Sequence, residues 1–255
     1  DIKLKDLNLI YGAKNIGKTD FVLQYYQQAE FKNLKKMYIN LKDSKINPNK
    51  DFDDLESFCQ KEKVEILIVD SYMPSFKLPN LPKITLISDI PYQIANYSIF
   101  ELPPITFYEY QQIHKPNIQD SFNNYLKYGN LFEAESLNDY KKGEFLKFLA
   151  NDNIHFWILK NLAQNLGLKV SLHQIYTKLK KEGKISKDRF YEYAKFLQDI
   201  KILFWLEKFE HNLSPKKLYF YDFTLKNAVS YDKYFSSLFE HMLFLDLLYH
   251  FKQDI

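Results

Sequence analysis

The sequence of 255 residues has one cysteine and six glycines, and it contains no long apolar run. The single Cys59 excludes an internal disulfide framework and a zinc site built from several cysteines, and it indicates a reduced, half-buried residue of a cytosolic protein. No apolar run approaches the ~18 residues of a membrane span and no signal peptide opens the chain, so we expect a cytoplasmic protein without membrane contact. The chain begins at Asp1 rather than at an initiator methionine, from which we expect that the native N-terminus was trimmed or is not included.

Aromatic residues, by contrast, are abundant, with 22 Phe and 20 Tyr. Together with the scarcity of glycine, this composition excludes a disordered or fibrous chain. The length allows one large domain or two smaller ones with a well-buried core.

One segment matches the phosphate-binding loop pattern G-x-x-x-x-G-K-[ST] at every fixed position. Its residues are Gly12, Ala13, Lys14, Asn15, Ile16, Gly17, Lys18 and Thr19. The apolar stretch 7–11 before it predicts a strand and the stretch 20–26 after it predicts a helix, so backbone N–H groups and the helix dipole would converge on one anion. In such a loop the glycines let the backbone curl around phosphate, Lys18 reaches the outer phosphates and the Thr19 hydroxyl ligates Mg²⁺. An ordinary glycine-containing turn is the alternative, and the strand–loop–helix context favours nucleoside triphosphate binding.

A phosphate loop of this kind needs an acidic residue at the end of a neighbouring apolar strand to complete the Mg²⁺ shell. Asp70 closes the apolar run 64–69 and is our candidate, with a simple strand-ending carboxylate as the alternative. Ser71 stands where active ATPases of this type commonly carry a glutamate that polarises water, which predicts slow hydrolysis. Ser88 and Asp89 end the next predicted strand, where they would sense the terminal phosphate or orient water, or would only form a turn.

Arg189 is the only arginine of the chain, and all other basic residues are lysines. Many P-loop enzymes place an arginine on the terminal phosphate to stabilise transition-state charge. Here any such role falls to this one distant residue or to lysine, or is missing.

Strand and helix signals alternate over the first hundred residues. Strands are predicted at 7–11, 36–41, 64–69, 84–87 and 97–100, and a helix at 51–61. This alternation favours an α/β fold, a P-loop NTPase with a parallel sheet and helices on both faces. The pattern changes after Pro103-Pro104 and predicts a helical lid over 105–150, which the capping-box sequence from Thr106 to Glu109 opens.

A third region follows the lid and carries three short helix signals, at 158–166, 172–179 and 189–197. Gly167 and Gly183-Lys184 are predicted stops between them, and Ser186 is a predicted N-cap. The runs 202–206 and 218–221 then predict a β-hairpin. Three helices and a hairpin describe a winged-helix domain, which we place at residues 151–222 between the P-loop core at 1–104 with its lid and a C-terminal helical extension at 223–255.

Basic residues dominate the stretch from Lys169 to Arg189, where Glu182 and Asp188 are the only acids. Such a patch would contact DNA phosphates, or would be a solvated lysine-rich face, since winged helices also bind proteins. The candidate DNA-contacting residues are Lys178, Lys181, Lys184, Lys187 and Arg189.

Five segments together resemble the AAA-type ATPases of archaea and bacteria that carry a winged helix after the ATPase core. They are Tyr11–Thr19, the strand ending at Asp70, Phe100–Tyr110, Tyr125–Asn130 and Lys217–Asp222. The resemblance spans nearly the whole chain and implies ATP and Mg²⁺ as ligands. The sequence departs from the family at one place, where Ile94-Ala95-Asn96 stands instead of an arginine. This difference weakens the expectation of nucleotide-triggered switching.

Many members of that group continue into a restriction-endonuclease-like domain, whose opening helix the segment Phe239–Phe244 resembles. Glu240 alone would cleave nothing, so we assign no nuclease activity.

The sequence as a whole predicts an ATP-binding P-loop ATPase with slow hydrolysis, in which the catalytic residues are Lys18 and Asp70 and the metal-shell residues are Thr19 and Asp70. The nucleotide state would move the lid and the winged helix, on DNA or on a partner protein. A nucleotide-gated regulatory module without hydrolysis is the first alternative, and a small-molecule phosphotransferase is the second. No base-specificity motif distinguishes ATP from GTP.

Overall fold

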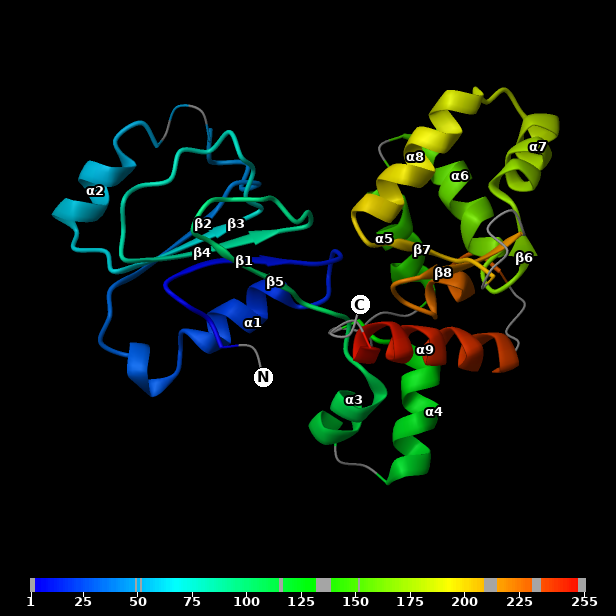
Figure 1. Cartoon of the computed structure of the whole chain (residues 1–255), viewed down its shortest axis with the longest axis horizontal. Helices are drawn as coiled ribbons and strands as arrows, with labels where there is room; N and C mark the ends of the chain where they lie inside the picture. Colours follow the sequence, from blue (N-terminus) through cyan, green and yellow to red (C-terminus); the bar gives the residue numbers. More distant parts are fainter. Residues whose placement is uncertain are drawn as a thin grey trace. The chain divides into compact units, whose positions relative to one another are not determined.

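The computed structural model describes residues 3–48, 50, 52–114, 117–131, 139–150, 152–208, 215–230 and 235–251. The chain divides into two compact units, Asp1–Pro103 and Pro104–Ile255 (Figure 1). Over the described residues, no helix is both long and apolar enough to cross a membrane.

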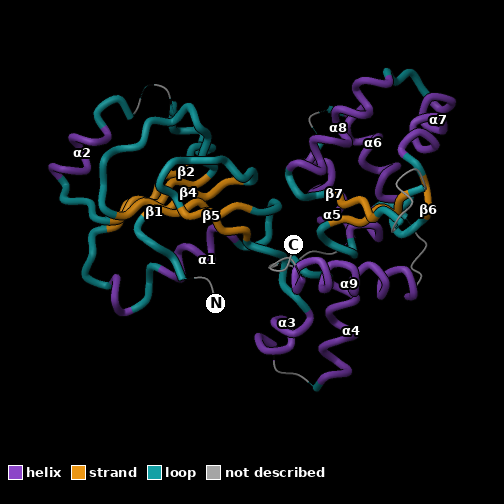
Figure 2. The backbone as a smooth tube through the Cα atoms, in the orientation of Figure 1, coloured by secondary structure: helices purple, strands orange, loops and turns teal. Residues whose placement is uncertain are grey.

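The first unit is built on a sheet of five parallel strands in the order β2-β3-β4-β1-β5. Figure 2 draws the strands in orange. The strands are β1 (Leu7–Tyr11), β2 (Lys36–Asn40), β3 (Ile66–Asp70), β4 (Lys83–Ser88) and β5 (Ser98–Glu101). In register, Tyr11 of β1 pairs with Ser88 of β4 and Glu101 of β5, so these strands end level with one another. The carboxyl ends of a parallel sheet meet at one edge, which is where ligands bind in such folds.

Helices cover both faces of this sheet, with α1 (Lys18–Tyr25) and the 3₁₀ helix η1 (Ala29–Phe31) on one face and α2 (Leu55–Lys61) on the other (Figure 1). Alternate residues of β3 serve the two cores: Ile66 and Ile68 lie in the core that includes Val22 of α1, and Leu67 and Val69 in the core that includes Cys59 of α2. Every residue of β3 is buried, as expected for a central parallel strand.

The boundaries of two elements differ from the prediction. Strand β3 begins at Ile66 rather than at residue 64 and includes Asp70, because Asn40 and Asp70 remain paired at the end of the ladder with β2. Helix α2 begins at Leu55 rather than at residue 51, which lies outside the described residues, and residues 52–54 form turns.

The second unit is mainly helical. Its first four helices are α3 (Phe107–His114), α4 (Ile118–Tyr128), α5 (Asp139–Leu149) and α6 (Asn153–Gln164). Then follow β6 (Lys169–Val170), α7 (Leu172–Glu182), α8 (Lys187–Asp199), β7 (Leu203–Leu206), β8 (Lys216–Phe220), the 3₁₀ helix η3 (Leu225–Ala228) and α9 (Phe235–His250). The predicted hairpin is confirmed by the antiparallel pairing of β7 with β8, and the short strand β6, which the sequence did not indicate, adds to its other side.

Side-chain caps define where several of these helices begin. Thr106 and Glu109 form the predicted capping box, in which each accepts a hydrogen bond from the backbone N–H of the other. Ser186 caps α8 as predicted, accepting from Arg189 N. Helix α6 begins at Asn153 rather than at residue 158, because Asp152 accepts hydrogen bonds from the N–H groups of the first turn.

Helix α9 contributes to the core of the second unit. Its Met242 and Leu245 are buried against Tyr110 of α3 and Tyr125 of α4, which places the segment Phe239–Phe244 in the same core as these helices. The Glu240 carboxylate accepts hydrogen bonds from Lys217 and Tyr219 of β8.

Two of the segments that carry the family resemblance, Tyr125–Asn130 and Lys217–Asp222, meet in a buried polar network. The Asn130 side chain donates to the Tyr221 carbonyl at 2.9 Å, and Asn130 N donates to the Asp222 carboxylate at 3.2 Å. Gly129 has a left-handed φ of 96°, and a Cβ there would lie 2.6 Å from Thr224 Oγ1 and against the Asp222 carboxylate. The network therefore requires glycine at position 129.

Candidate functional site

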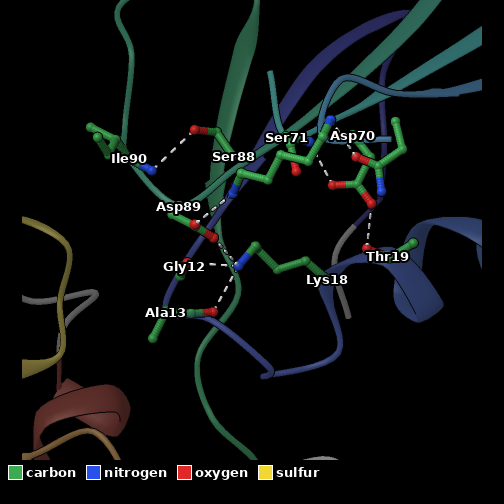
Figure 3. Close-up of polar contacts among 11 residues, drawn as sticks. Gly12, Ala13, Lys18, Thr19, Asp70, Ser71, Ser88, Asp89 and Ile90 are labelled. Atoms are coloured by element: carbon green, nitrogen blue, oxygen red, sulfur yellow. Dashed lines mark hydrogen bonds and ion pairs between the residues drawn. The ribbon is translucent and has the colours of Figure 1, made fainter. Parts of the chain in front are cut away.

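The segment 12–19 connects the carboxyl end of β1 to the first turn of α1. Gly17, in left-handed conformation, is the N-cap of this helix, and Lys18 and Thr19 are its first residues. Because β1 lies between β4 and β5, residues after β4 reach the same edge of the sheet (Figure 3).

Gly12 is fixed by a close backbone approach. Leu102 N donates to the Tyr11 carbonyl at 2.8 Å, which brings the backbone after β5 against the loop. A Cβ on Gly12 would lie 2.5 Å from both Leu102 O and Ile16 Cδ1. No larger residue fits without moving β5 or the loop.

Lys18 is folded back onto its own loop. Its Nζ donates to Gly12 O at 2.8 Å, to Ala13 O at 2.7 Å and to the Asp89 carboxylate at 3.0 Å (Figure 3). The side chain is 8 % exposed. Burial lowers the pKa of Lys18 and the charge of Asp89 acts in the opposite direction, so the carboxylate favours the charged ammonium.

Asp70 closes β3 and holds a small network of donors. Its Oδ2 accepts from Thr19 Oγ1 at 2.7 Å and its Oδ1 accepts from Ser71 N at 2.6 Å (Figure 3). The Oδ2 also accepts from the Tyr38 hydroxyl at 2.8 Å. Burial, and secondarily the hydrogen bond to Asp70, raise the pKa of Tyr38, so its hydroxyl remains a donor. Ser71, the residue at which the sequence lacks the glutamate expected of an active ATPase, has a left-handed φ of 56°.

The two polar residues after β4 have different roles. Ser88 Oγ accepts from Ile90 N at 3.1 Å, which is a local turn contact. Asp89 instead reaches the loop, where its second oxygen lies 3.7 Å from Lys42 Nζ. Ser88 thus makes the contact that the turn alternative describes, while Asp89 lies beside the loop.

The structure brings together the predicted residues of the first unit: the loop 12–19 and Asp70 lie at one edge of the sheet, and Thr19 and Asp70 are in contact. Tyr38 and Lys42 are site residues that the sequence reasoning missed. For Tyr38, the alternation of side chains along β2 was a signal that could have placed it near Asp70. Residues 38 and 40 share one face of the strand, and they pair with Ile68 and Asp70 of β3. Lys42 follows the strand with no distinguishing pattern.

The candidate residues of the second unit form a separate set. Lys178, Lys181, Lys184 and Lys187 are exposed on α7, the following turn and the start of α8. The guanidinium of Arg189 instead pairs with Asp152, the N-cap of α6. The single arginine therefore already has a carboxylate partner.

A metal site made only of protein groups is absent from the described part of the chain, where no three His, Cys, Asp or Glu residues converge. The Thr19 hydroxyl and the Asp70 carboxylate are hard oxygen donors. Such a pair suits Mg²⁺, which binds through one or two protein groups, water and substrate phosphates rather than in an all-protein cage.

Comparison with known proteins agrees with this architecture. No protein-family model matches the sequence. The chain is 24% identical, over an alignment of 304 residues, to the uncharacterised protein MJ1544 of Methanocaldococcus jannaschii, which covers 97% of this chain and 68% of that protein. It is also similar in structure to the Walker-type ATPase PABY2304 of Pyrococcus abyssi, with a TM-score of 0.53, 11% identity and coverage of 88% of this chain and 91% of the other. The Orc1 protein of Aeropyrum pernix, solved in complex with DNA, matches with a TM-score of 0.39 and 12% identity over 90% of this chain and 87% of the other. The five-stranded parallel sheet and the similarity to the Pyrococcus ATPase confirm the prediction of an α/β fold with a P-loop NTPase sheet.

Proposed function

We propose that the chain binds ATP with Mg²⁺ at the edge of the first sheet and hydrolyses it slowly. The observation that carries this proposal is the arrangement around Lys18. This residue begins α1 and its ammonium donates to Ala13 O of the loop, and the following Thr19 contacts Asp70. Backbone N–H groups at a helix start, a lysine and a hydroxyl–carboxylate pair are the groups that bind a magnesium triphosphate.

Each residue has a separate role in this proposal. Residues 12–17 curl around the phosphates, and Lys18 turns from its loop carbonyls to the phosphate oxygens. Thr19 and Asp70 would hold Mg²⁺, which when bound neutralises phosphate charge. Tyr38 and Ser71 N keep the Asp70 carboxylate oriented. Slow hydrolysis follows from Ser71, which offers no carboxylate to polarise the attacking water.

We also propose that the nucleotide state is coupled to the second unit, with a lid at 105–150, a winged helix at 151–222 and a helical extension at 223–255. The chain order α6-β6-α7-α8-β7-β8 and the sheet order β6-β8-β7 support the winged helix. The exposed lysines near the turn between α7 and α8 support contact with DNA phosphates, with a protein partner as the alternative.

The test is Mg²⁺-dependent ATP turnover and ATP binding by the purified chain, with and without duplex DNA. Lys18→Ala should abolish turnover, while Lys45→Ala, which removes an exposed lysine of the same unit, should not. Tight ATP binding without any turnover would support the alternative, a nucleotide-gated regulatory module. Turnover that forms a phosphorylated small molecule instead of inorganic phosphate would identify a phosphotransferase. Equal ATP binding by Lys18→Ala and the unmodified chain would refute the nucleotide site.

The cysteine and the two tryptophans of the chain can be used to test which unit binds ATP. Cys59 is the only cysteine and lies buried in the first unit, whereas both tryptophans, Trp157 and Trp205, belong to the second. A ligand at ~100 times its Kd stabilises the folded form by about 2.7 kcal/mol. ATP should therefore slow the reaction of the Cys59 thiol under mild denaturation and change the tryptophan-detected unfolding less.

A further inference from the structure

Asp89 lies among lysines from separate parts of the first unit. Its carboxylate is 3.0 Å from Lys18 Nζ in the loop and 3.7 Å from Lys42 Nζ, which follows β2. Asp89 also favours the charged form of Lys14, whose pKa is lowered chiefly by burial. One carboxylate therefore supplies countercharge to a group of ammonium ions.

The burial of Lys18 gives the physical reason for this arrangement. An ammonium removed from water is costly unless it is paired and hydrogen-bonded. Gly12 O and Ala13 O satisfy two of its N–H groups, and of the residues that the structure describes only Asp89 brings a negative charge into hydrogen-bond contact. A terminal phosphate offers the same ammonium more oxygens and more charge, so it is a stronger partner than the carboxylate.

We propose that Asp89 occupies, in the nucleotide-free protein, the place of the terminal phosphate of a bound nucleoside triphosphate, and that Lys42 is a second ligand of that phosphate beside Lys18. The inference rests on the proposed function and identifies the residue that carries charge at its terminal phosphate. When the nucleotide binds, phosphate oxygens replace the two carboxylate oxygens at both ammonium groups. Asp89 thus competes with the nucleotide for Lys18 and Lys42.

The position of Lys42 suits this role. Leu41 N donates to the Asp70 carbonyl at 3.1 Å, which ties the segment after β2 to the end of β3 beside the loop. The Lys42 side chain is 60 % exposed, so it has room to follow a phosphate. The sequence of the first unit contains no arginine, so lysine is the side chain that supplies permanent positive charge there.

The experiment measures the Kd of ATP and of ADP, each with Mg²⁺, by titration calorimetry. Lys42→Ala should weaken ATP binding by about tenfold, the loss of one charge-assisted contact, and leave ADP binding within about twofold. The matched control is Lys45→Ala, which removes the same charge from an exposed residue of the same segment and should change neither constant. Asp89→Asn removes the competing charge and should tighten ATP binding.

Three results would overturn the inference. Lys42→Ala could behave like Lys45→Ala, it could weaken ATP and ADP binding equally, or Asp89→Asn could leave ATP binding unchanged or weaker. An unchanged reactivity of Cys59 verifies that each variant keeps its fold. If Lys18→Ala retained full ATP affinity, the proposed function itself would fail. If only Lys18→Ala lost affinity, the function would stand and the role of Lys42 would be wrong.

Discussion

Two residues of α9 should give opposite contributions to the pH dependence of the second unit. His241 is buried with its Nε2 at Phe220 of β8, and burial, aided by the charge of Lys226, lowers its pKa to about 4. Burial, with a smaller effect of Glu109, raises the pKa of Asp246 to about 6. Both groups are therefore neutral in the folded protein between about pH 4 and 6, where their unfolded counterparts are charged.

The signs follow from proton uptake. For His241 the unfolded chain binds more protons below its ordinary pKa of 6.5, so stability falls as the pH drops from 6.5 toward 4. That shift corresponds to about 3 kcal/mol. For Asp246 the folded protein binds more protons, so stability falls as the pH rises from 3.8 toward 6. Its contribution is smaller than the shift suggests, because the carboxyl is only partly buried and solvent screens it.

Asp246→Asn removes one of the two opposing contributions and keeps an acceptor for Phe107 N, the donor that now opposes the shift. Between pH 6.5 and 4 this variant should show the His241 loss of about 3 kcal/mol without the gain from Asp246 that offsets part of it in the unmodified chain, so it should lose more stability than the unmodified chain. His241→Gln should show the reverse, with stability rising on acidification. Urea unfolding followed by tryptophan fluorescence measures this directly, because Trp157 and Trp205 both lie in the second unit.

The informative quantity is the difference between each variant and the unmodified chain as a function of pH, since all other titrating groups cancel in it. Parallel profiles for Asp246→Asn and the unmodified chain would refute the assignment to Asp246. Difference profiles of the same sign for both variants would refute the reasoning about burial.

Two further predictions concern glycine and tyrosine positions. Gly129→Ala should destabilise the second unit by about 3 kcal/mol or more, from left-handed strain and from contact with the Asp222 carboxylate, in tryptophan-detected unfolding. The matched control Gly143→Ala, in helix α5 with no atom within 4 Å of the added Cβ, should be neutral or stabilising, and equal losses for the two would contradict the argument. Tyr38→Phe should lower the stability of the first unit by about 1 kcal/mol, measured by the reaction rate of Cys59 in urea, because Asp70 loses one donor. An unchanged rate would show that water replaces the hydroxyl without cost.

The local patterns of the sequence were sufficient for the central part of the fold. The apolar run before Asp70 predicts a buried strand because both faces of a parallel sheet are covered, and every residue of β3 is indeed buried. The loop pattern predicts the turn between β1 and α1 because its two glycines and the strand and helix signals beside them are adjacent in the chain. Capping residues such as Ser186 accept hydrogen bonds from N–H groups within three residues of themselves, so the helix starts that they make could also be predicted.

Contacts between distant segments were not readable from these patterns. Strand β6 has only two residues, too few for a periodic signal, and exists because Lys169 and Val170 pair with β8. The contact of Asn130 with Tyr221 joins residues 91 positions apart. The sequence predicts Arg189 as a DNA-contacting cation, and only the structure shows that its guanidinium pairs with Asp152.

The sequence by itself determined the phosphate loop, its flanking strand and helix, and Asp70 as the neighbouring acid, because each depends on residues adjacent in the chain. The tertiary structure alone decided that Asp89 faces Lys18 and Lys42, while Ser88 only closes a turn. The physical reason is that charge pairing acts over a few ångströms in space. Asp89 is 71 positions from Lys18 and 47 from Lys42 in the chain, and the parallel sheet brings them together only when it folds.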